Sequence, residues 1–393
     1  MNQNLEKLYQ ISHKKSKLIL GLMSGTSLDG LDLALCEITG FGKSTKLNLK
    51  FFKTVEYSTE LKNQISKVFA KGLVELPFLS ALNAELGRIH GEMINKTLKE
   101  WKVENNSIDL IASHGQTIMH VPKNNFGMGS STFQIGEADI ISKETGIITV
   151  SDFRQKHIAH GGEGAPLVVF GDYLLFSNPN KDQILLNIGG IGNFTFLPRS
   201  ENTNEIKLSD TGPGNTLIDA GMRYFYQKDF DQDGLIARSG KMIPELWESL
   251  INHPFLKREY PKSTGPEEFD FQFIIQNFSE FESQDIIRTL TEYSVYCIEK
   301  SFKDLINLDN CLNTEILISG GGANNLFLIE LLQNKFPNLS VGKMKKEMIH
   351  PEAKEAALFA VLCNETISNP ESSKQRRLGP HPWPYFGKIS FPD

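Results

Sequence analysis

Three glycine-rich turns, each directly after an apolar stretch, are the parts of this sequence that point most clearly to chemistry. They lie at 25–30, 189–192 and 320–322. Glycine lets a backbone approach a phosphate closely and aim several N–H groups at it, and Thr26 and Ser27 add hydroxyl donors to the first turn. One such turn usually only reverses the chain, but three of them after strands favour a cradle for a nucleotide and its phosphates.

A carboxylate follows in the stretch LSDTGPGNTLID at 208–219, where Asp210 is expected to end a strand. Ligands in open α/β sheets bind beyond the carboxyl ends of strands. Asp210 could therefore be a general base that takes a proton from water or from a sugar hydroxyl. The alternative is that Asp210 only caps the helix expected after Gly214, and the residues alone leave both interpretations open.

Polar side chains also follow two further strands. SHGQT at 113–117 supplies His114, Gln116 and Thr117, and SDFR at 151–154 supplies Arg154. Together they could form a hydrogen-bonding wall for a polyhydroxy or carboxylated ligand. Ordinary loop chemistry is the alternative for any one of these residues taken alone.

The elements that must position these residues form two related series. Alternating or continuous apolar patterns predict strands at 17–23, 31–38, 47–58, 107–115 and 145–153, with helical spacing over 59–101. The second series has strand, glycine turn and strand at 182–198, helices at 215–227 and 284–306, strand, turn and helix at 314–333, and a last helix at 352–367. The helix after the third turn is expected to open at Asn324, and the Pro/Gly-rich tail GPHPWPYFGK at 379–388 is expected to be irregular.

This repetition predicts two α/β domains. We expect an N-terminal extension at 1–16, a first domain at 17–150 and a second at 151–351, with 352–393 returning to the first. The chain of 393 residues is long enough for two such cores.

Composition narrows the classes of partner. A formal net charge of −6 argues against nucleic acid or an anionic membrane as partner. The four cysteines form no CxxC pair, which indicates reduced thiols rather than a zinc or redox site. No apolar run reaches the length of a membrane span, and the polar N-terminus lacks a signal-peptide core, so we expect a cytoplasmic protein. Whether the chain forms a homodimer and which residues bind a metal are left open.

Taken together, the motifs resemble the anhydro-N-acetylmuramic acid kinase family, from near residue 18 almost to the end of the chain. The resemblance rests on eight stretches in order: GLMSGTSLDGLD, SHGQT, TFQIGEADI, SDFR with GGEGAPL, LNIGGIGNF, DTGPGN, PKSTGPEEFD and SGGGANN. It implies an α/β, two-domain fold of the actin-like/hexokinase-like ATPase type with a central cleft.

The resemblance implies that the three turns bind ATP. The nucleotide-binding residues would be Gly25, Thr26, Ser27, Leu28, Asp29, Gly30, Leu31 and Asp32 in the first turn, Asn187, Gly189 and Gly190 in the second, and Gly320, Gly321 and Gly322 beside the nucleoside. Met23 precedes the first turn where many members of the superfamily carry Asp. Mg²⁺ would then be held mainly by ATP oxygens and water, with Asp29 or Asp32 as helpers.

The resemblance also implies the reaction. Water would open the 1,6-anhydro ring of 1,6-anhydro-N-acetylmuramic acid with Asp210 as base, and the released O6 would take the γ-phosphoryl group, giving N-acetylmuramic acid 6-phosphate for peptidoglycan recycling. Arg154 would bind the lactyl carboxylate, and His114, Gln116 and Thr117 the hydroxyls. Two alternatives remain: a related kinase of a free sugar, and a non-catalytic regulator that senses ATP and muropeptides.

Overall fold

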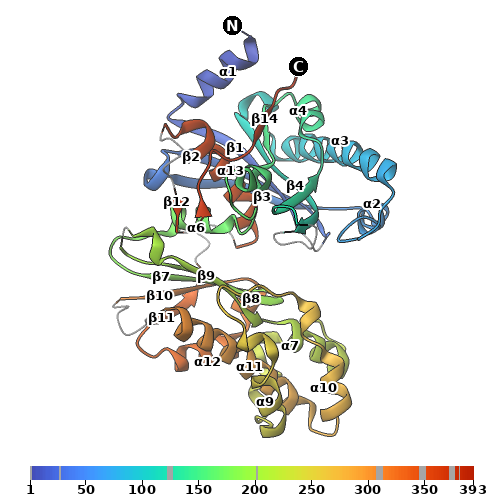
Figure 1. The fold of residues 1–393 in the computed structure, drawn as a ribbon, viewed down its shortest axis with the longest axis vertical. Helices are drawn as coiled ribbons and strands as arrows, with labels where there is room; N and C mark the ends of the chain where they lie inside the picture. Colours follow the sequence, from blue (N-terminus) through green and yellow to red (C-terminus); the bar gives the residue numbers. More distant parts are fainter. Residues whose placement is uncertain are drawn as a thin grey trace. The chain divides into compact units, whose positions relative to one another are not determined.

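The chain divides into two compact units, shown in Figure 1. Unit 1 comprises Met1–Leu175 and Glu352–Asp393, and unit 2 comprises Phe176–Pro351. The computed structural model describes residues 2–25, 28–121, 127–200, 202–306, 313–344, 351–370, 377–379 and 381–393.

Residues 151–175, which the sequence analysis assigns to the second domain, pack within unit 1. The reason is an aromatic cluster shared with the C-terminal segment. Phe153 contacts Phe359 with a ring-centroid separation of 5.2 Å, and Phe170 contacts Trp383 and Phe386 at 5.5 and 5.0 Å.

Unit 1 is built on one sheet with the strand order β14-β6-β4-β1-β2-β3. Its strands are β1 (Ser16–Ser24), β2 (Gly30–Thr39), β3 (Lys46–Glu56), β4 (Leu110–Val121), β5 (Ser131–Ile135), β6 (Thr149–Ser151) and β14 (Lys388–Ser390). β1, β2 and β3 form an antiparallel meander, whereas β4 runs parallel to β1, and β6 runs parallel to β4. β5 pairs with the second half of β4.

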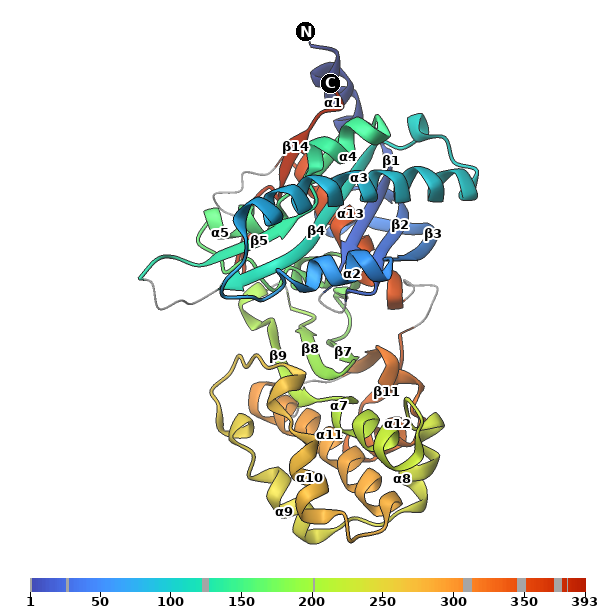
Figure 2. The same ribbon diagram turned by 90° about the vertical axis from the view of Figure 1, so that its right-hand side faces the viewer.

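Helices cover both faces of this sheet. Leu20 and Leu22 of β1 share a core with residues of α3 (Leu76–Trp101). Gly21 points to the other face, where a Cβ would lie 1.9 Å from the Ala356 oxygen of α13 (Lys354–Ser368). Figure 2 shows α3 in front of the strands and α13 behind them.

The remaining elements of this part of the chain are short. They are α1 (Gln3–Ser12), α2 (Thr59–Ser66), α4 (Ala138–Thr145), α5 (Phe153–Ala159), α6 (Val168–Phe176), β12 (Arg377–Leu378) and β13 (His381–Pro382).

Unit 2 repeats the sheet of unit 1, with the strand order β11-β10-β7-β8-β9. Its strands are β7 (Gln183–Ile188), β8 (Ile191–Leu197), β9 (Lys207–Pro213), β10 (Glu315–Ser319) and β11 (Ser340–Lys343). Again three strands form an antiparallel meander, and two more continue in parallel from its first strand. The predicted α/β class with two related domains is confirmed.

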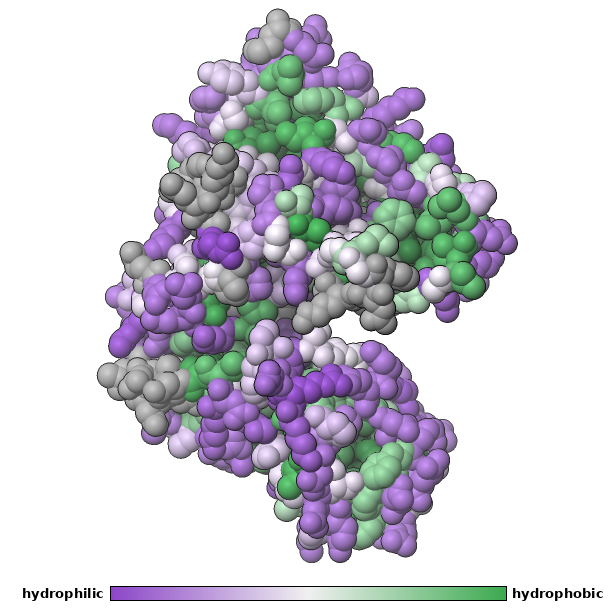
Figure 3. All heavy atoms as spheres, in the orientation of Figure 1, coloured by the Kyte–Doolittle hydropathy of each residue, from purple (hydrophilic) through white to green (hydrophobic). Residues whose placement is uncertain are grey.

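The helices of unit 2 pack around a core centred on α11. They are α7 (Thr216–Gly221), α8 (Leu235–Ser239), α9 (Pro244–Ile251), α10 (Phe271–Phe278), α11 (Ser283–Leu305) and α12 (Leu326–Lys335). Ile287 and Leu290 of α11 share this core with Ile184 and Ile188 of β7. Hydrophilic side chains predominate on the face of unit 2 seen in Figure 3. Among the described helices, none has the length and apolarity to cross a membrane.

Three local predictions were wrong. The strand predicted at 107–115 does not end there, because β4 continues to Val121 along β5. The tail at 379–388 is not wholly irregular, because β13 pairs with β12 and Lys388 begins β14, which pairs with β6. The helix expected to open at Asn324 begins at Leu326.

Candidate functional site

The first glycine turn joins β1 to β2 in unit 1. The Leu28 N–H donates to the Gly25 carbonyl at 3.4 Å. A Cβ on Gly30 would lie 2.2 Å from the Val55 oxygen, so only glycine allows this close approach of β2 to β3. Thr26 and Ser27, which were predicted to contribute hydroxyls, lie outside the described residues.

Carboxylates lie at the β2 side of this turn. Asp32 accepts a hydrogen bond from the Thr54 hydroxyl at 2.6 Å. Burial raises the pKa of Asp32 above its ordinary value, and the negative charges of Glu352 and Asp29 raise it further. The hydrogen bond from Thr54 opposes this rise. The described residues contain no group of three or more His, Cys, Asp or Glu side chains that could hold a metal ion. Asp29 and Asp32 nevertheless suit Mg²⁺, which is usually bound by one or two carboxylates together with substrate phosphates.

Arg154 and His114 are brought together in unit 1, as the sequence analysis expects of one wall. The Arg154 Nε donates to His114 Nε2 at 2.7 Å, and Nη1 donates to the Gly164 carbonyl at 3.0 Å. Burial, with a smaller effect of the Arg154 charge, lowers the pKa of His114 to about 3. The ring is therefore neutral, and we assign its single N–H to Nδ1, which lies 2.7 Å from the Gly115 carbonyl.

Gln116, in contrast, is directed to the first glycine turn. Its side chain is fully buried. Its Nε2 donates to the carbonyls of Gly25 and Thr117 at 3.1 and 3.2 Å, and its Oε1 accepts from the Ser24 hydroxyl at 2.5 Å. The Thr117 hydroxyl accepts from Gln134 of β5 at 3.3 Å. The structure thus separates the predicted wall into a pair around Arg154 and a pair that joins β4 to its neighbours.

A polar cavity of about 300 Å³ lies beside His114, where β4 leaves β6 and begins to pair with β5. Three buried oxygens of its lining have no hydrogen-bond partner among the described residues: Ser113 Oγ, Gln134 Oε1 and Gln155 Oε1. Sequence reasoning did not single out these residues. Gln134 lies within the quoted motif TFQIGEADI, so the motif itself was the available signal.

The second glycine turn joins β7 to β8 in unit 2, and its carbonyls are already engaged. The Gly214 N–H donates to the Gly190 carbonyl at 2.7 Å, and the Asn215 N–H donates to the Gly189 carbonyl at 2.8 Å. The Asn215 side chain donates to the Ile188 carbonyl at 3.2 Å. These contacts fix the orientation of the peptide groups in the turn.

The third turn lies against the second, because β10 runs parallel to β7. A Cβ on Gly320 would lie 2.6 Å from the Ile188 oxygen and 2.7 Å from Asn187 Oδ1. The predicted residues Asn187, Gly189, Gly190 and Gly320–Gly322 are therefore neighbours in unit 2.

Asp210 lies within β9, opposite Asn193 of β8, and not at the end of its strand as predicted. The pairing shifts between Gly192 and Asn193, which leaves an extra residue in β9 at this point. Asp210 does not cap the following helix either, because Asn215 occupies the N-cap position of α7.

The Asp210 carboxylate is held by the segment 262–264. Its Oδ2 accepts from the Thr264 N–H at 2.9 Å, and the Asp210 N–H donates to the Lys262 carbonyl at 3.0 Å. Burial raises the pKa of Asp210 to about 6, against the hydrogen bonds from the Thr264 N–H and the Ser263 hydroxyl, which lower it. A half-buried carboxylate with such a pKa is suited to exchange protons near neutral pH.

Comparison with known proteins shows the family. A family model described as anhydro-N-acetylmuramic acid kinase matches residues 17–387. An anhydro-N-acetylmuramic acid kinase of Pseudoalteromonas atlantica is 44% identical over 404 residues, covering 100% of each chain. One of Bacillus thuringiensis is 37% identical over 379 residues, covering 95% of this chain and 99% of the relative. The chain belongs to the anhydro-N-acetylmuramic acid kinase family.

All the predicted site residues lie within the part that matches the anhydro-N-acetylmuramic acid kinase model. Residues 1–16 precede that match, but the alignment with the Pseudoalteromonas atlantica relative covers them. Solved structures similar to this chain are more distant. A Clostridium difficile activator of 2-hydroxyisocaproyl-CoA dehydratase with bound ADPNP has a TM-score of 0.39 at 12% identity, covering 89% of this chain and 95% of that one. A Schistosoma mansoni hexokinase complexed with glucose has a TM-score of 0.37 at 12% identity, covering 90% and 86%.

Proposed function

We propose that this kinase opens the 1,6-anhydro ring of 1,6-anhydro-N-acetylmuramic acid with water and phosphorylates the released O6 from ATP. The products would be N-acetylmuramic acid 6-phosphate and ADP, which would place the enzyme in peptidoglycan recycling. Membership of the family supports the substrate. The observation that carries the chemistry is the Asp210 carboxylate, fixed by the Thr264 N–H at 2.9 Å with its pKa raised to about 6.

Asp210 acts as the general base in this proposal. It takes a proton from water as the water oxygen bonds to the anomeric carbon, and the bond from that carbon to O6 breaks. O6 keeps the electron pair and bonds to the γ-phosphorus, while the bond between this phosphorus and the β–γ bridging oxygen breaks and ADP leaves. Since the ring opening itself supplies a nucleophilic O6, the chain needs no second base.

The glycine turns position ATP. Phosphoryl transfer depends mainly on orientation and on neutralising charge, and the N–H groups of the turns at Gly25–Asp29 and Gly189–Gly190 would do both for the phosphates. Gly320–Gly322 would lie beside the nucleoside. Mg²⁺ supplies charge neutralisation when bound, and Asp32 and Asp29 would hold it together with ATP oxygens and water.

Arg154 binds the lactyl carboxylate of the sugar in this proposal. Its Nε and Nη1 are engaged by His114 and Gly164, so Nη2 is the donor that we propose for the carboxylate. His114 would thus act by orienting Arg154, and Gln116 and Thr117 by shaping β4. The sugar's neutral polar groups would find partners in the cavity beside His114, at Ser113 and Gln134.

Isotope labelling tests the ring-opening step. With the anhydro-sugar and ATP in H₂¹⁸O, we expect one labelled oxygen at the anomeric position of the phosphosugar, seen by mass spectrometry during the first turnovers. A kinase of free sugars would instead phosphorylate N-acetylmuramic acid and leave the anhydro-sugar intact. A regulator would form no ADP with either compound.

The anomeric oxygen of a free sugar can exchange with water without an enzymatic ring opening, so this exchange has to be measured as a control. Unlabelled N-acetylmuramic acid 6-phosphate, incubated with enzyme in H₂¹⁸O for the same time, gives the background. Labelling at this background rate during turnover would contradict hydrolytic opening.

The pH profile tests the base. Because the deprotonated form of Asp210 is active and its pKa is about 6, kcat/KM should rise through pH 6 to a plateau. Below this pH it should fall by about tenfold per pH unit. Asp219 also has its pKa raised to about 6, by burial, so Asp219→Asn is the matched control. That variant should keep the acid limb, whereas a flat profile down to about pH 5 in the unchanged enzyme would exclude a base with this pKa.

A further inference from the structure

Tyr57 holds both ends of the first glycine turn. It follows β3 directly, and its side chain is 3% exposed. The Tyr57 N–H donates to the Asp29 carbonyl at 3.1 Å, at the end of the turn. The Tyr57 hydroxyl lies 2.8 Å from the Ser24 hydroxyl, at the start of the turn. One residue thus connects the two segments, which come from different strands.

His90 of α3 supports this hydroxyl. Its Nε2 lies 2.7 Å from the Tyr57 hydroxyl, and the two rings stack with an interplanar angle of 9°. The ring is fully buried, and its Nδ1 has no hydrogen-bond partner among the described residues. Burial lowers the pKa of His90 to about 3, so the ring is neutral and carries one N–H.

This arrangement gives the hydrogen bonds one direction. In proteins, a buried N–H without an acceptor is rarer than a buried acceptor without a donor. We therefore assign the unpartnered Nδ1 of His90 as the acceptor nitrogen, and its N–H to Nε2, which donates to the Tyr57 oxygen. The Tyr57 hydroxyl then donates to Ser24, and Ser24 donates to Gln116 Oε1 at 2.5 Å. Gln116 Nε2 completes the series by donating to the Gly25 carbonyl at 3.1 Å.

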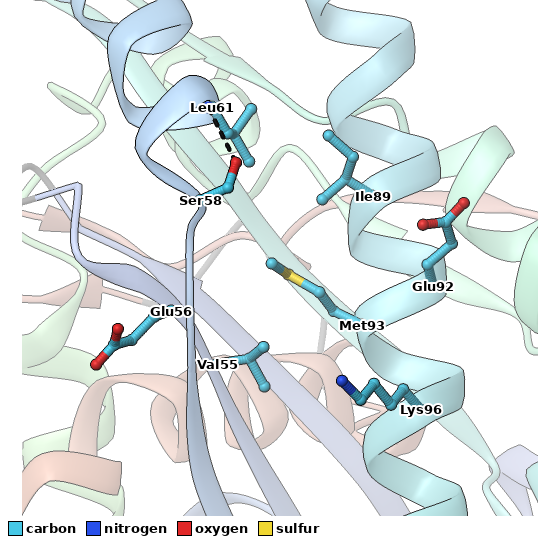
Figure 4. A pocket seen from close by; sticks show the side chains of 8 residues that line it. All are labelled: Val55, Glu56, Ser58, Leu61, Ile89, Glu92, Met93 and Lys96. Carbon is cyan, nitrogen blue, oxygen red and sulfur yellow. Dashed lines mark hydrogen bonds between the residues drawn. The ribbon is translucent and has the colours of Figure 1, made fainter.

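His90 lies in the middle of a long helix and is packed closely by a neighbouring segment. α3 runs over 26 residues, and Gly136, whose Cβ would lie 3.4 Å from His90 Nδ1, closes the far side of the ring. Figure 4 shows the same junction of α3 and β3, with Met93 of α3 lying between Ile89 and Val55 of β3. These residues line a cavity of about 380 Å³ together with Glu56, Ser58, Leu61, Glu92 and Lys96.

We propose that Tyr57, oriented by His90, is a positioning residue that fixes Ser24, Gly25 and Asp29 for binding of the ATP phosphates. This inference rests on the proposed function, because it requires that the first turn receives ATP. Tyr57 is 3% exposed and its hydroxyl is engaged by Ser24 and His90, so in this proposal it acts on the nucleotide through the segments that it holds.

The test is Tyr57→Phe, which removes the hydroxyl and keeps the ring and the backbone contact to Asp29. We expect the KM for ATP to rise by about tenfold, the effect of one lost buried hydrogen bond. The KM for the anhydro-sugar should stay within about twofold of that of the original enzyme, as for a substitution that does not touch the sugar site.

Tyr226→Phe is the matched control, because the Tyr226 hydroxyl also makes one hydrogen bond, with the Ser283 hydroxyl at 2.8 Å. Tyr226→Phe should change the melting temperature about as much as Tyr57→Phe does, but it should leave both KM values unchanged.

A second pair of variants covers the case in which Tyr57→Phe does not fold. His90→Gln retains an N–H donor and should keep the KM for ATP near that of the original enzyme, whereas His90→Leu should raise it. An unchanged KM for ATP in Tyr57→Phe or in His90→Leu, in an enzyme that still phosphorylates the anhydro-sugar, would overturn the positioning role and leave the proposed function intact. A wild-type protein without ATP-dependent turnover would overturn both.

Discussion

Replacing Asp210 by Asn will abolish turnover while leaving ATP binding intact. Asn has the size of Asp, and its Oδ1 can still accept the Thr264 N–H that now bonds to Asp210 at 2.9 Å. An amide cannot take a proton from water, however, so the base contribution is lost. We expect kcat to fall by about 10³–10⁴-fold, or about 4–5 kcal/mol of barrier.

Two measurements separate this effect from unfolding. ADP release in the presence of the anhydro-sugar gives kcat, and calorimetric titration gives the affinity for ATP. Asp219→Asn, which removes another carboxylate of unit 2 that the mechanism does not use, should keep kcat within about threefold, as a change away from the reacting atoms. A loss of less than about tenfold in Asp210→Asn, about 1.4 kcal/mol, would remove Asp210 from the role of base.

The glycine turns could be predicted from the sequence because their signal is local. An apolar strand, a run of glycines and a second apolar strand are consecutive in the chain, as at Ile188–Ile191 between β7 and β8. The doubling of this pattern also predicted two related α/β domains, whereas the actin-like/hexokinase-like type was implied by the family resemblance. The repeated strand order of the two sheets follows from it, since each meander leaves its first strand free to pair in parallel with a later one.

The roles of the polar residues on β4 could not be predicted, because their partners are distant in sequence. Gln116 appeared to be one member of a wall, but its amide bonds to the Gly25 carbonyl, which lies 91 residues away. Arg154 meets His114 from 40 residues away. Sequence spacing gives the chemistry that is available in a segment, and tertiary contacts decide which atoms remain for a ligand.

The environment of Asp210 shows the same limit. A bulge in β9 and the return of the segment 262–264 place an N–H on its carboxylate. The bulge has no local sequence signal, and the motif PKSTGPEEFD, which contains 262–264, does not indicate which strand the segment contacts, so the strand was expected to end at Asp210. The domain boundary was misplaced for a related reason, because Phe170 finds its aromatic partners at Trp383 and Phe386, far along the chain.

Gly320→Ala should have the second large effect. Gly320 has φ 80° and ψ 175°, a region that is almost exclusive to glycine and costs other residues about 1–3 kcal/mol. The added Cβ would also lie 2.6 Å from the Ile188 oxygen and 2.7 Å from Asn187 Oδ1. Because both neighbours belong to β7, which leads directly into the second turn, relief of the contact must displace one turn from the other. We expect the affinity for ATP to fall by about 30–100-fold, with a lower melting temperature.

The matched control lies on the adjacent strand. A Cβ added to Gly342 of β11 would meet no heavy atom within 4 Å, and Gly342 has no positive φ. Gly342→Ala should therefore change neither ATP affinity nor melting temperature.

Titration of Gly320→Ala with ATP and with ADP separates the contribution of the third turn from that of the second, because we assign the third turn to the nucleoside and the second to the phosphates. If only the nucleoside contact were lost, the affinities for ATP and for ADP would fall by the same factor. Because we expect the second turn to be displaced as well, the affinity for ATP should fall by a larger factor than the affinity for ADP. Equal affinity of Gly320→Ala and the unchanged enzyme for ATP would mean that these two turns do not form the nucleotide site.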